Sequence, residues 1–174
     1  MAESRQRKVV VGIDGTPGSE SALEWAIQYA REGGAQVVAA FALELAPSAY
    51  YPADTAVVTR GMADAEEGLL RDFERSWCEP LRQAHVSWKA AVGRGPASRW
   101  LAELAEREDA DLVVVGRRGL NAVAEIFLGS VSRQLSHTCT VPLVLVPAAF
   151  RAAHGQAEAK AVTAENLVST KPAS

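Results

Sequence analysis

The sequence has little of what several classes of protein require. Its 174 residues include only two cysteines, Cys78 and Cys139, too few for the disulfide framework of a small secreted domain. Apolar runs such as residues 112–115 and 141–146 are far shorter than the roughly 20 residues of a membrane span. Positive charge is not in excess either, because 18 lysines and arginines face 21 aspartates and glutamates. We therefore expect a cytoplasmic protein that binds neither nucleic acid nor membrane.

Lysine is scarce, and its positions limit the possible chemistry. The four lysines are Lys8, Lys89, Lys160 and Lys171, and the Gly-x4-Gly-Lys-Ser/Thr loop is missing. A lysine on the β- and γ-phosphates is a standard part of phosphoryl transfer in P-loop enzymes. The sequence also shows no nucleophile elbow and no cluster with metal-ligand spacing. We assign no catalytic and no metal-binding residue and expect at most slow hydrolysis of a bound nucleotide; whether the chain is an enzyme stays open.

The chain alternates short apolar runs with helical patterns. Five runs predict strands, at residues 8–13, 36–42, 86–92, 111–115 and 141–146. Helical patterns begin at Thr16-Pro17, cover 62–81, begin at Gly95-Pro96 and cover 130–137. Residues 45–58 are interpreted as a loop, since they hold two prolines and little periodicity. This alternation predicts an α/β fold, an open doubly wound parallel sheet with helices on both faces.

One domain accounts for residues 1–150. Residues 151–174 are mostly alanine and polar residues without a strand pattern, so we expect a tail that is disordered or loosely helical. In doubly wound sheets a ligand binds beyond the carboxyl ends of the strands, where the strand order reverses. The loops after the first and the fourth strand are therefore the places to look for a site.

The loop after the fourth strand contains three glycines and a serine, with the spacing Gly-x2-Gly-x9-Gly-Ser from Gly116 through Gly119 to Gly129 and Ser130. Glycine lets a backbone approach a ligand closely or adopt positive φ. Ser130 opens a predicted helix, and the amides at a helix N-terminus attract an anion. Two interpretations are open, a phosphate-binding loop and a glycine-rich turn without a ligand.

Other residues near these loops have two interpretations each. Asp14 ends the first strand and either serves the pocket or is only a turn residue, because Asp-Gly is a common turn pair. Arg117 and Arg118 lie between the first two glycines and either pair with phosphates or are solvated. The four tryptophans fall on helix or strand patterns, so we expect them to pack.

The Gly-x2-Gly-x9-Gly-Ser motif, placed after an apolar strand, resembles the nucleotide-binding signature of the universal stress protein family, in its ATP-binding branch. Residues 9–26, VVVGIDGTPGSESALEWA, resemble that family's first strand and helix. Residues 129–137 and 141–147 resemble its last helix and strand, so the resemblance covers residues 7–147. It implies a five-stranded parallel sheet in the order 3-2-1-4-5 and a stress-response or signalling protein that acts through ligand-dependent conformation or partner choice.

The resemblance also implies a ligand and its contacts. The ligand is ATP, with or without Mg²⁺, and the alternative is AMP or cyclic AMP. The family's phosphate and ribose contacts match Gly116, Gly119, Gly129 and Ser130, and its acidic residue near the adenosine matches Asp14. Further positions near the nucleotide are Ile13, Ala42, Val115, Arg118, Val131 and Ser132.

The family's strand order places residues 141–146 at the sheet edge, where unpaired backbone groups invite pairing with another chain. We therefore expect a homodimer through this edge.

A weak ATPase and a dimeric interaction protein with a vestigial pocket are the alternative functions.

Overall fold

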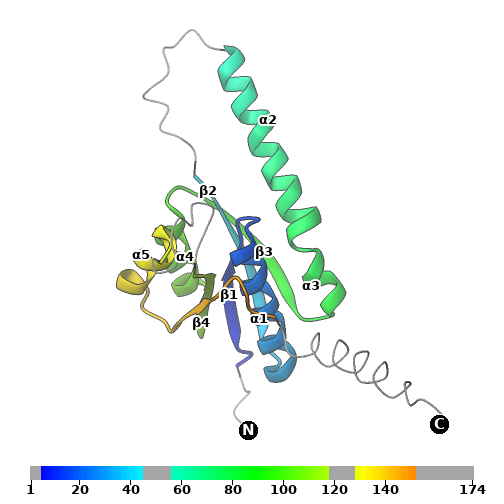
Figure 1. Cartoon of the computed structure of the whole chain (residues 1–174), viewed down its shortest axis with the longest axis vertical. Helices are drawn as coiled ribbons and strands as arrows, with labels where there is room; N and C mark the ends of the chain where they lie inside the picture. The colour runs from blue at the N-terminus through cyan, green and yellow to red at the C-terminus, as the bar shows by residue number, and fades with distance from the viewer. Residues whose placement is uncertain (1–4, 45–55, 118–127, 152–174) are drawn as a thin grey trace, which may run out of the picture.

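The computed structural model describes residues 5–44, 56–117 and 128–151. Its strands form one parallel sheet in the order β3-β2-β1-β4-β5 (Figure 1). The strands are β1 (Lys8–Gly12), β2 (Gln36–Leu43), β3 (Trp88–Arg94), β4 (Leu112–Gly116) and β5 (Leu143–Val146). The predicted fold class and strand order are confirmed.

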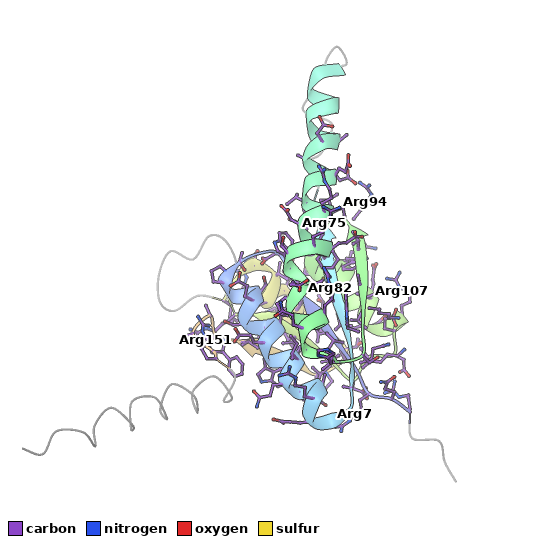
Figure 2. The ribbon with its side chains drawn as sticks, turned by 90° about the vertical axis from the view of Figure 1, so that its right-hand side faces the viewer. Arg7, Arg75, Arg82, Arg94, Arg107 and Arg151 are labelled. Atoms are coloured by element: carbon purple, nitrogen blue, oxygen red, sulfur yellow. The ribbon has the colours of Figure 1, made fainter. Side chains whose placement is uncertain are left out.

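Helical segments cover both faces of the sheet. They are α1 (Pro17–Gly33), α2 (Ala56–Asp72), the π-helical turn η2 (Phe73–Trp77), α3 (Glu79–Ala84), α4 (Ala97–Arg107) and α5 (Ser130–Thr138). Successive side chains of a strand point to opposite faces. Val9 and Val11 of β1 therefore join one core with α1, η2 and α3, and Val10 joins a second core with α4 and α5. The upper part of α2 extends beyond the sheet (Figures 1 and 2).

The Thr16-Pro17 signal acts as expected at the start of α1. The Thr16 hydroxyl oxygen accepts a hydrogen bond from the Ser19 amide at 3.3 Å, and Pro17 occupies the first turn. Gly34 ends the helix in the left-handed conformation, with φ 66°. Thr16 and Pro17 thus fix the N-terminus of α1 shortly after β1, at the carboxyl edge of the sheet.

The single helix predicted at residues 62–81 is wrong, because Pro80 interrupts it. Proline has no amide hydrogen, and its ring clashes with the carbonyl four residues earlier in an α-helix. The chain instead makes the turn η2, in which the Cys78 amide donates to the Phe73 carbonyl at 3.1 Å, and then restarts as α3. Residues 56–58 of the predicted loop belong to α2, while residues 45–55 lie outside the described part of the chain.

All five strands differ from their predicted bounds, the fifth and the third by two residues and the others by one. The fifth begins at Leu143 instead of residue 141, because Pro142 offers the ladder only its carbonyl, which accepts from the Val113 amide at 2.9 Å. The third runs two residues further than predicted, because β2 continues to Leu43 and pairs there with Arg94. Both changes leave the order of the strands as predicted.

Candidate functional site

A cavity of about 420 Å³ opens at the carboxyl ends of β1, β2 and β4, where the strand order reverses. The N-terminal parts of α1, α4 and α5, together with residues of α2 and η2, complete its walls. The predicted site residues that line it are Ile13, Asp14, Ala42, Val115, Gly116, Gly129, Ser130, Val131 and Ser132. The structure thus brings the loops after the first and fourth strands together. Arg118 and Gly119 lie outside the described residues.

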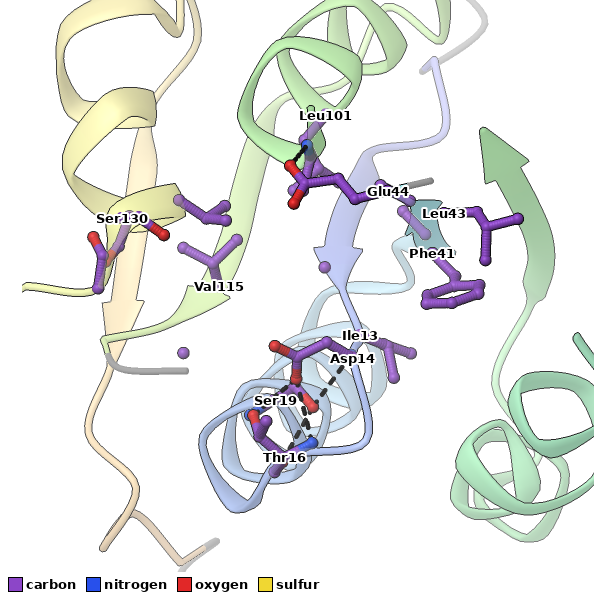
Figure 3. A pocket seen from close by; sticks show the side chains of 18 of the residues that line it. Ile13, Asp14, Thr16, Ser19, Phe41, Leu43, Glu44, Leu101, Val115 and Ser130 are labelled. Atoms are coloured by element: carbon purple, nitrogen blue, oxygen red, sulfur yellow. Dashed lines mark hydrogen bonds between the residues drawn. The ribbon is translucent and has the colours of Figure 1, made fainter. Parts of the chain in front are cut away.

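Asp14 lines this cavity and also closes the turn before α1. Its Oδ1 accepts from the Thr16 amide at 3.1 Å and from the Thr16 hydroxyl at 2.6 Å (Figure 3). Its own amide donates to the Ser19 hydroxyl oxygen at 3.3 Å. No donor in the described part of the chain reaches Oδ2, and the residue is exposed. The turn-residue interpretation therefore holds for one carboxylate oxygen, and the other is available to the cavity.

Glu44 is a second carboxylate at the cavity and is not among the site residues predicted from the sequence. Its Oε1 accepts from the Ala97 amide at 3.1 Å, across the mouth of the cavity at the start of α4 (Figure 3). A carboxylate at a helix N-terminus is stabilised by the helix dipole and by an amide that the helix itself leaves unpaired. An acidic residue directly after a strand, the position that Asp14 nearly occupies after β1, is the signal that could have found it.

The start of α5 differs from these two helix ends. Its N-cap is Gly129, and its first turn contains no acidic residue. The first bond within the helix runs from the Arg133 amide to the Gly129 carbonyl at 2.9 Å. Among the described residues, the amides of Ser130, Val131 and Ser132 have no acceptor. These three residues line the cavity, and their amides carry the positive end of the helix dipole.

Hydrogen bonds hold this helix end against the carboxyl end of β4. The Gly129 amide donates to the Arg117 carbonyl at 2.9 Å, and the buried Ser132 hydroxyl donates to the same carbonyl at 3.1 Å. The Arg117 amide donates in turn to the Val146 carbonyl at 2.8 Å. The Arg117 side chain is exposed and does not line the cavity. Within this loop Arg117 therefore acts through its backbone, which fits the solvated interpretation.

The glycines do not all play the role predicted for them. A Cβ on Gly116 would lie 2.6 Å from the carbonyl carbon of Gly18, so the close approach that needs glycine here is that of the α1 backbone. Gly129 has φ −60° and ψ 160°, an extended conformation that any residue adopts, so positive φ is not its reason. Gly116 therefore shapes the cavity by letting α1 pack close to β4.

The wall of the cavity next to β2 is apolar and aromatic. It includes Phe41, Leu43 and Leu69 together with Trp77, the last residue of η2. The rings of Phe41 and Trp77 meet edge to face with centroids 5.4 Å apart, so the indole does pack, as expected of the tryptophans. The sequence places Trp77 in a helical pattern but gives no signal that it also faces a cavity.

Other reactive groups offer no competing site in the described part of the chain. Burial raises the pKa of the Cys78 thiol to about 11, which keeps it protonated and unreactive near neutral pH. No group of three or more His, Cys, Asp or Glu side chains in residues 5–44, 56–117 and 128–151 is placed to hold a metal ion. Within the same ranges, every helix is too short or too polar to cross a bilayer.

Comparison with known proteins agrees with the fold. The model of the universal stress protein family matches residues 6–147, which contain every described strand. The chain belongs to the universal stress protein family. It is similar to a universal stress protein of Synechocystis sp., with 29% identity over 148 residues that cover 79% of this chain and 96% of that relative.

Solved structures of the family share the fold. UspA from Lactobacillus plantarum superimposes with a TM-score of 0.69 at 19% identity, covering 83% of this chain and 99% of that one. A universal stress protein in complex with cAMP superimposes with a TM-score of 0.61 at 27% identity, covering 82% of this chain and 98% of that one. The present chain is thus a universal stress protein with the family's sheet and a cavity at its carboxyl edge.

Proposed function

We propose that this universal stress protein binds an adenine nucleotide in the cavity, with ATP as the ligand and its phosphates on the first amides of α5. The observation that carries the proposal is the contrast between the helix ends at the cavity. Asp14 and Glu44 supply carboxylates to the starts of α1 and α4, whereas α5 presents three amides without an acceptor in the described part of the chain. A bound anion completes the hydrogen bonds of such a helix end.

The remaining walls suit the other parts of a nucleotide. A carboxylate that accepts from ribose hydroxyls is a recurrent feature of nucleotide sites in doubly wound folds, and Asp14 has an oxygen available for it. Ile13, Ala42 and Val115 add apolar surface, and Gly116, Gly129, Ser130, Val131 and Ser132 surround the phosphate position. Arg118 and Gly119 belong to the same loop and are assigned to it on the sequence alone. The related structure in complex with cAMP supports an adenine nucleotide as the ligand class.

Calorimetric titration with ATP, ADP, AMP and cyclic AMP tests this proposal. We expect ATP to bind most tightly, because each added phosphate places more negative charge near the amides of α5. A preference for AMP or cyclic AMP would keep the site and change the ligand. Absence of binding for all four nucleotides at millimolar concentration, confirmed by equilibrium dialysis, would contradict the proposal.

We infer that any hydrolysis of ATP is slow. Lys8 and Lys89, the two lysines in the described part of the chain, lie at the amino ends of β1 and β3, away from the cavity. Both contact Glu108, with Nζ–Oε2 distances of 3.6 Å and 2.5 Å. Release of phosphate at an ordinary enzymatic rate of ~1–10³ s⁻¹ would promote the alternative function, an ATPase.

We propose further that the nucleotide acts through conformation or partner choice in a homodimer. β5 lies at one edge of the sheet, and its Leu143 and Leu145 are only half-buried in the isolated chain. Replacing either leucine by arginine should give a monomer in light scattering if this edge is the interface. An unchanged dimer mass for both folded variants would place the interface elsewhere, and a monomeric wild type would remove it.

We also propose residues 1–150 as the nucleotide-binding domain and a cytoplasmic location. Ser21 at the start of α1 donates to the Ala148 carbonyl at 2.9 Å, and Phe150 packs against the α1 side of the core, which supports a domain boundary near residue 150. Both cysteines are free thiols, which is the usual state in a reducing compartment. Residues 152–174 lie outside the described part of the chain.

A further inference from the structure

We infer that Trp77 is a specificity-determining residue of this site, forming an aromatic wall against which the nucleotide base stacks. This inference rests on the proposed function, because it assigns the base to one end of the same cavity. Its basis is the position of η2, a feature that neither the strand pattern nor the glycine motif requires.

The cavity has two chemically different ends. Ser130 and Val115 lie on one side, Phe41 and Leu43 lie on the other, and Ile13 and Asp14 lie between them (Figure 3). The α5 side offers amides, which suit phosphate, and the β2 side offers apolar and aromatic surface. A nucleotide whose phosphates meet α5 therefore places its base on the β2 side.

Trp77 forms part of that β2 side. Its ring lies edge to face against Phe41 and is only half-buried. On its other flank it packs so closely over Gly15 that a Cβ there would lie 2.5 Å from Cζ2 of the indole. Gly15 also has φ 74°, so both the close contact with the indole and the left-handed backbone favour glycine here. The indole is thus fixed between β2 and the loop after β1 while it still borders the cavity.

Leu69 adds exposed apolar surface to the cavity beside Trp77. Leu69 lines the same cavity on the last turns of α2 and has 40% of its surface exposed. A base inserted beside Trp77 would bury this apolar surface as well as the exposed part of the indole. Stacking of a base on an aromatic side chain contributes ~1–3 kcal/mol, so the indole is large enough to affect affinity measurably.

The π-helical turn is what delivers Trp77 to the cavity. Pro80 prevents an α-helix from continuing, and Arg82 satisfies carbonyls of the turn, donating to Glu74 at 2.7 Å and to Arg75 at 3.1 Å. Figure 2 shows Arg82 and Arg75 along this helical segment and Arg94 beside it. Arg94 forms an ion pair with Glu66, which ties α2 to the end of β3. π-Helical turns occur frequently at functional sites, in agreement with a binding role.

Tryptophan fluorescence and two ligands test the inference. AMP contains base, ribose and phosphate, whereas inorganic tripolyphosphate contains only the part expected at α5. In Trp77→Leu we expect AMP affinity to fall about tenfold and tripolyphosphate affinity to stay within about twofold of wild type. AMP should quench wild-type fluorescence, and this quenching should be lost in Trp77→Phe, which keeps an aromatic ring against Phe41 and guards against misfolding of the leucine variant.

Trp25→Phe is the matched control, because Trp25 stacks on Tyr29 of α1 and does not line the cavity. Quenching by AMP should persist in it. Unchanged AMP affinity in folded Trp77→Leu, an equal loss for AMP and tripolyphosphate, or full quenching in Trp77→Phe would each overturn the role of Trp77 while leaving nucleotide binding in place. A wild type that binds no nucleotide at all would overturn the proposed function and this inference with it.

Discussion

The N-termini of α1 and α5 both border the cavity, but among the described residues only that of α1 has a carboxylate beside it. At α1, Asp14 accepts from the amide of the N-cap residue Thr16, and the Thr16 hydroxyl oxygen accepts from the Ser19 amide, so a carboxylate lies at the positive end of the helix dipole. At α5, the N-cap is a glycine and the first turn has no acidic residue. A helix end that already has a carboxylate repels a second anion, and one without a carboxylate attracts it. The wall formed by the start of α5 is therefore the one suited to phosphate.

We expect the greatest effect from placing a carboxylate at the start of α5, as Asp14 and Glu44 do at the starts of α1 and α4. Gly129→Asp fits the extended backbone at this position and places a carboxylate against the Ser130–Ser132 amides. We expect ATP affinity to fall about 100-fold, since the ligand loses charged hydrogen bonds and meets a like charge. Stability should rise by up to about 1 kcal/mol, because the helix gains a cap and a favourable dipole interaction.

Gly129→Asn is the matched control for that variant, because it adds a cap of the same shape without charge. Calorimetry should show an ATP affinity between those of Gly129→Asp and wild type, and denaturant unfolding should show both variants to be folded. Equal affinities for the aspartate variant and wild type would mean that phosphate does not bind at α5.

The next effect concerns the carboxylate at the other helix end. Asp14→Ala removes the acceptor for Thr16 together with the oxygen available to the cavity, so affinity should fall about tenfold and stability by about 1 kcal/mol. Asp14→Asn keeps an acceptor for the turn and should recover most of the stability but little of the affinity. If both variants lose stability and keep wild-type affinity, Asp14 is a turn residue only.

Substitution of Glu44 should affect stability and affinity less than substitution of Asp14. Glu44→Gln keeps an acceptor for the Ala97 amide and removes the charge from the start of α4, so stability should fall by about 0.3–1 kcal/mol. Nucleotide affinity should change less than about threefold, because Glu44 binds the Ala97 amide and the phosphates are proposed to bind at α5 instead. A tenfold change in affinity would show that Glu44 contacts the ligand.

The smallest effect concerns a carboxylate at the opposite end of the same helix. Glu108 caps the C-terminus of α4, where the dipole disfavours a negative charge, and the Lys89 ammonium followed by that of Lys8 lowers the pKa of its carboxyl group. A lowered pKa stabilises the fold above the unfolded-state value of 4.5, and this contribution is lost as the pH falls through the folded-state value.

Unfolding measured against pH in wild type and Glu108→Gln tests that statement. As the pH is lowered from 5, the free energy of unfolding should fall more in the wild type than in the variant. ATP affinity at pH 7 should be the same in both. Parallel stability curves would mean that the lysines do not stabilise this carboxylate.

The sequence predicted the parts of this molecule that depend on local patterns. Apolar runs located the strands, Thr16-Pro17 located the start of α1, and the spacing of Gly129 and Ser130 located the start of α5. The strand order came from the resemblance to the family, because no local pattern specifies which strands are neighbours.

What the sequence did not predict depends on contacts between distant segments. Gly116 is required by the backbone of Gly18, and Glu44 acts on the amide of Ala97, so neither role is visible in its own loop. Pro80 was visible, but the helical periodicity around it suggested one continuous helix. The break that Pro80 causes places Trp77 at the cavity, which only the packing of η2 on β2 reveals.

An amide NMR titration that compares ATP with adenosine tests directly whether phosphate binds at the start of α5. If phosphate binds at α5, ATP should shift the amide resonances of Ser130, Val131 and Ser132 strongly downfield, as expected of amides that donate to phosphate oxygens. Adenosine should leave these three resonances nearly unchanged while it shifts those near Asp14. If ATP instead shifts the amides of Thr16 and Ser19 most and leaves those of Ser130–Ser132 unmoved, phosphate does not bind at α5.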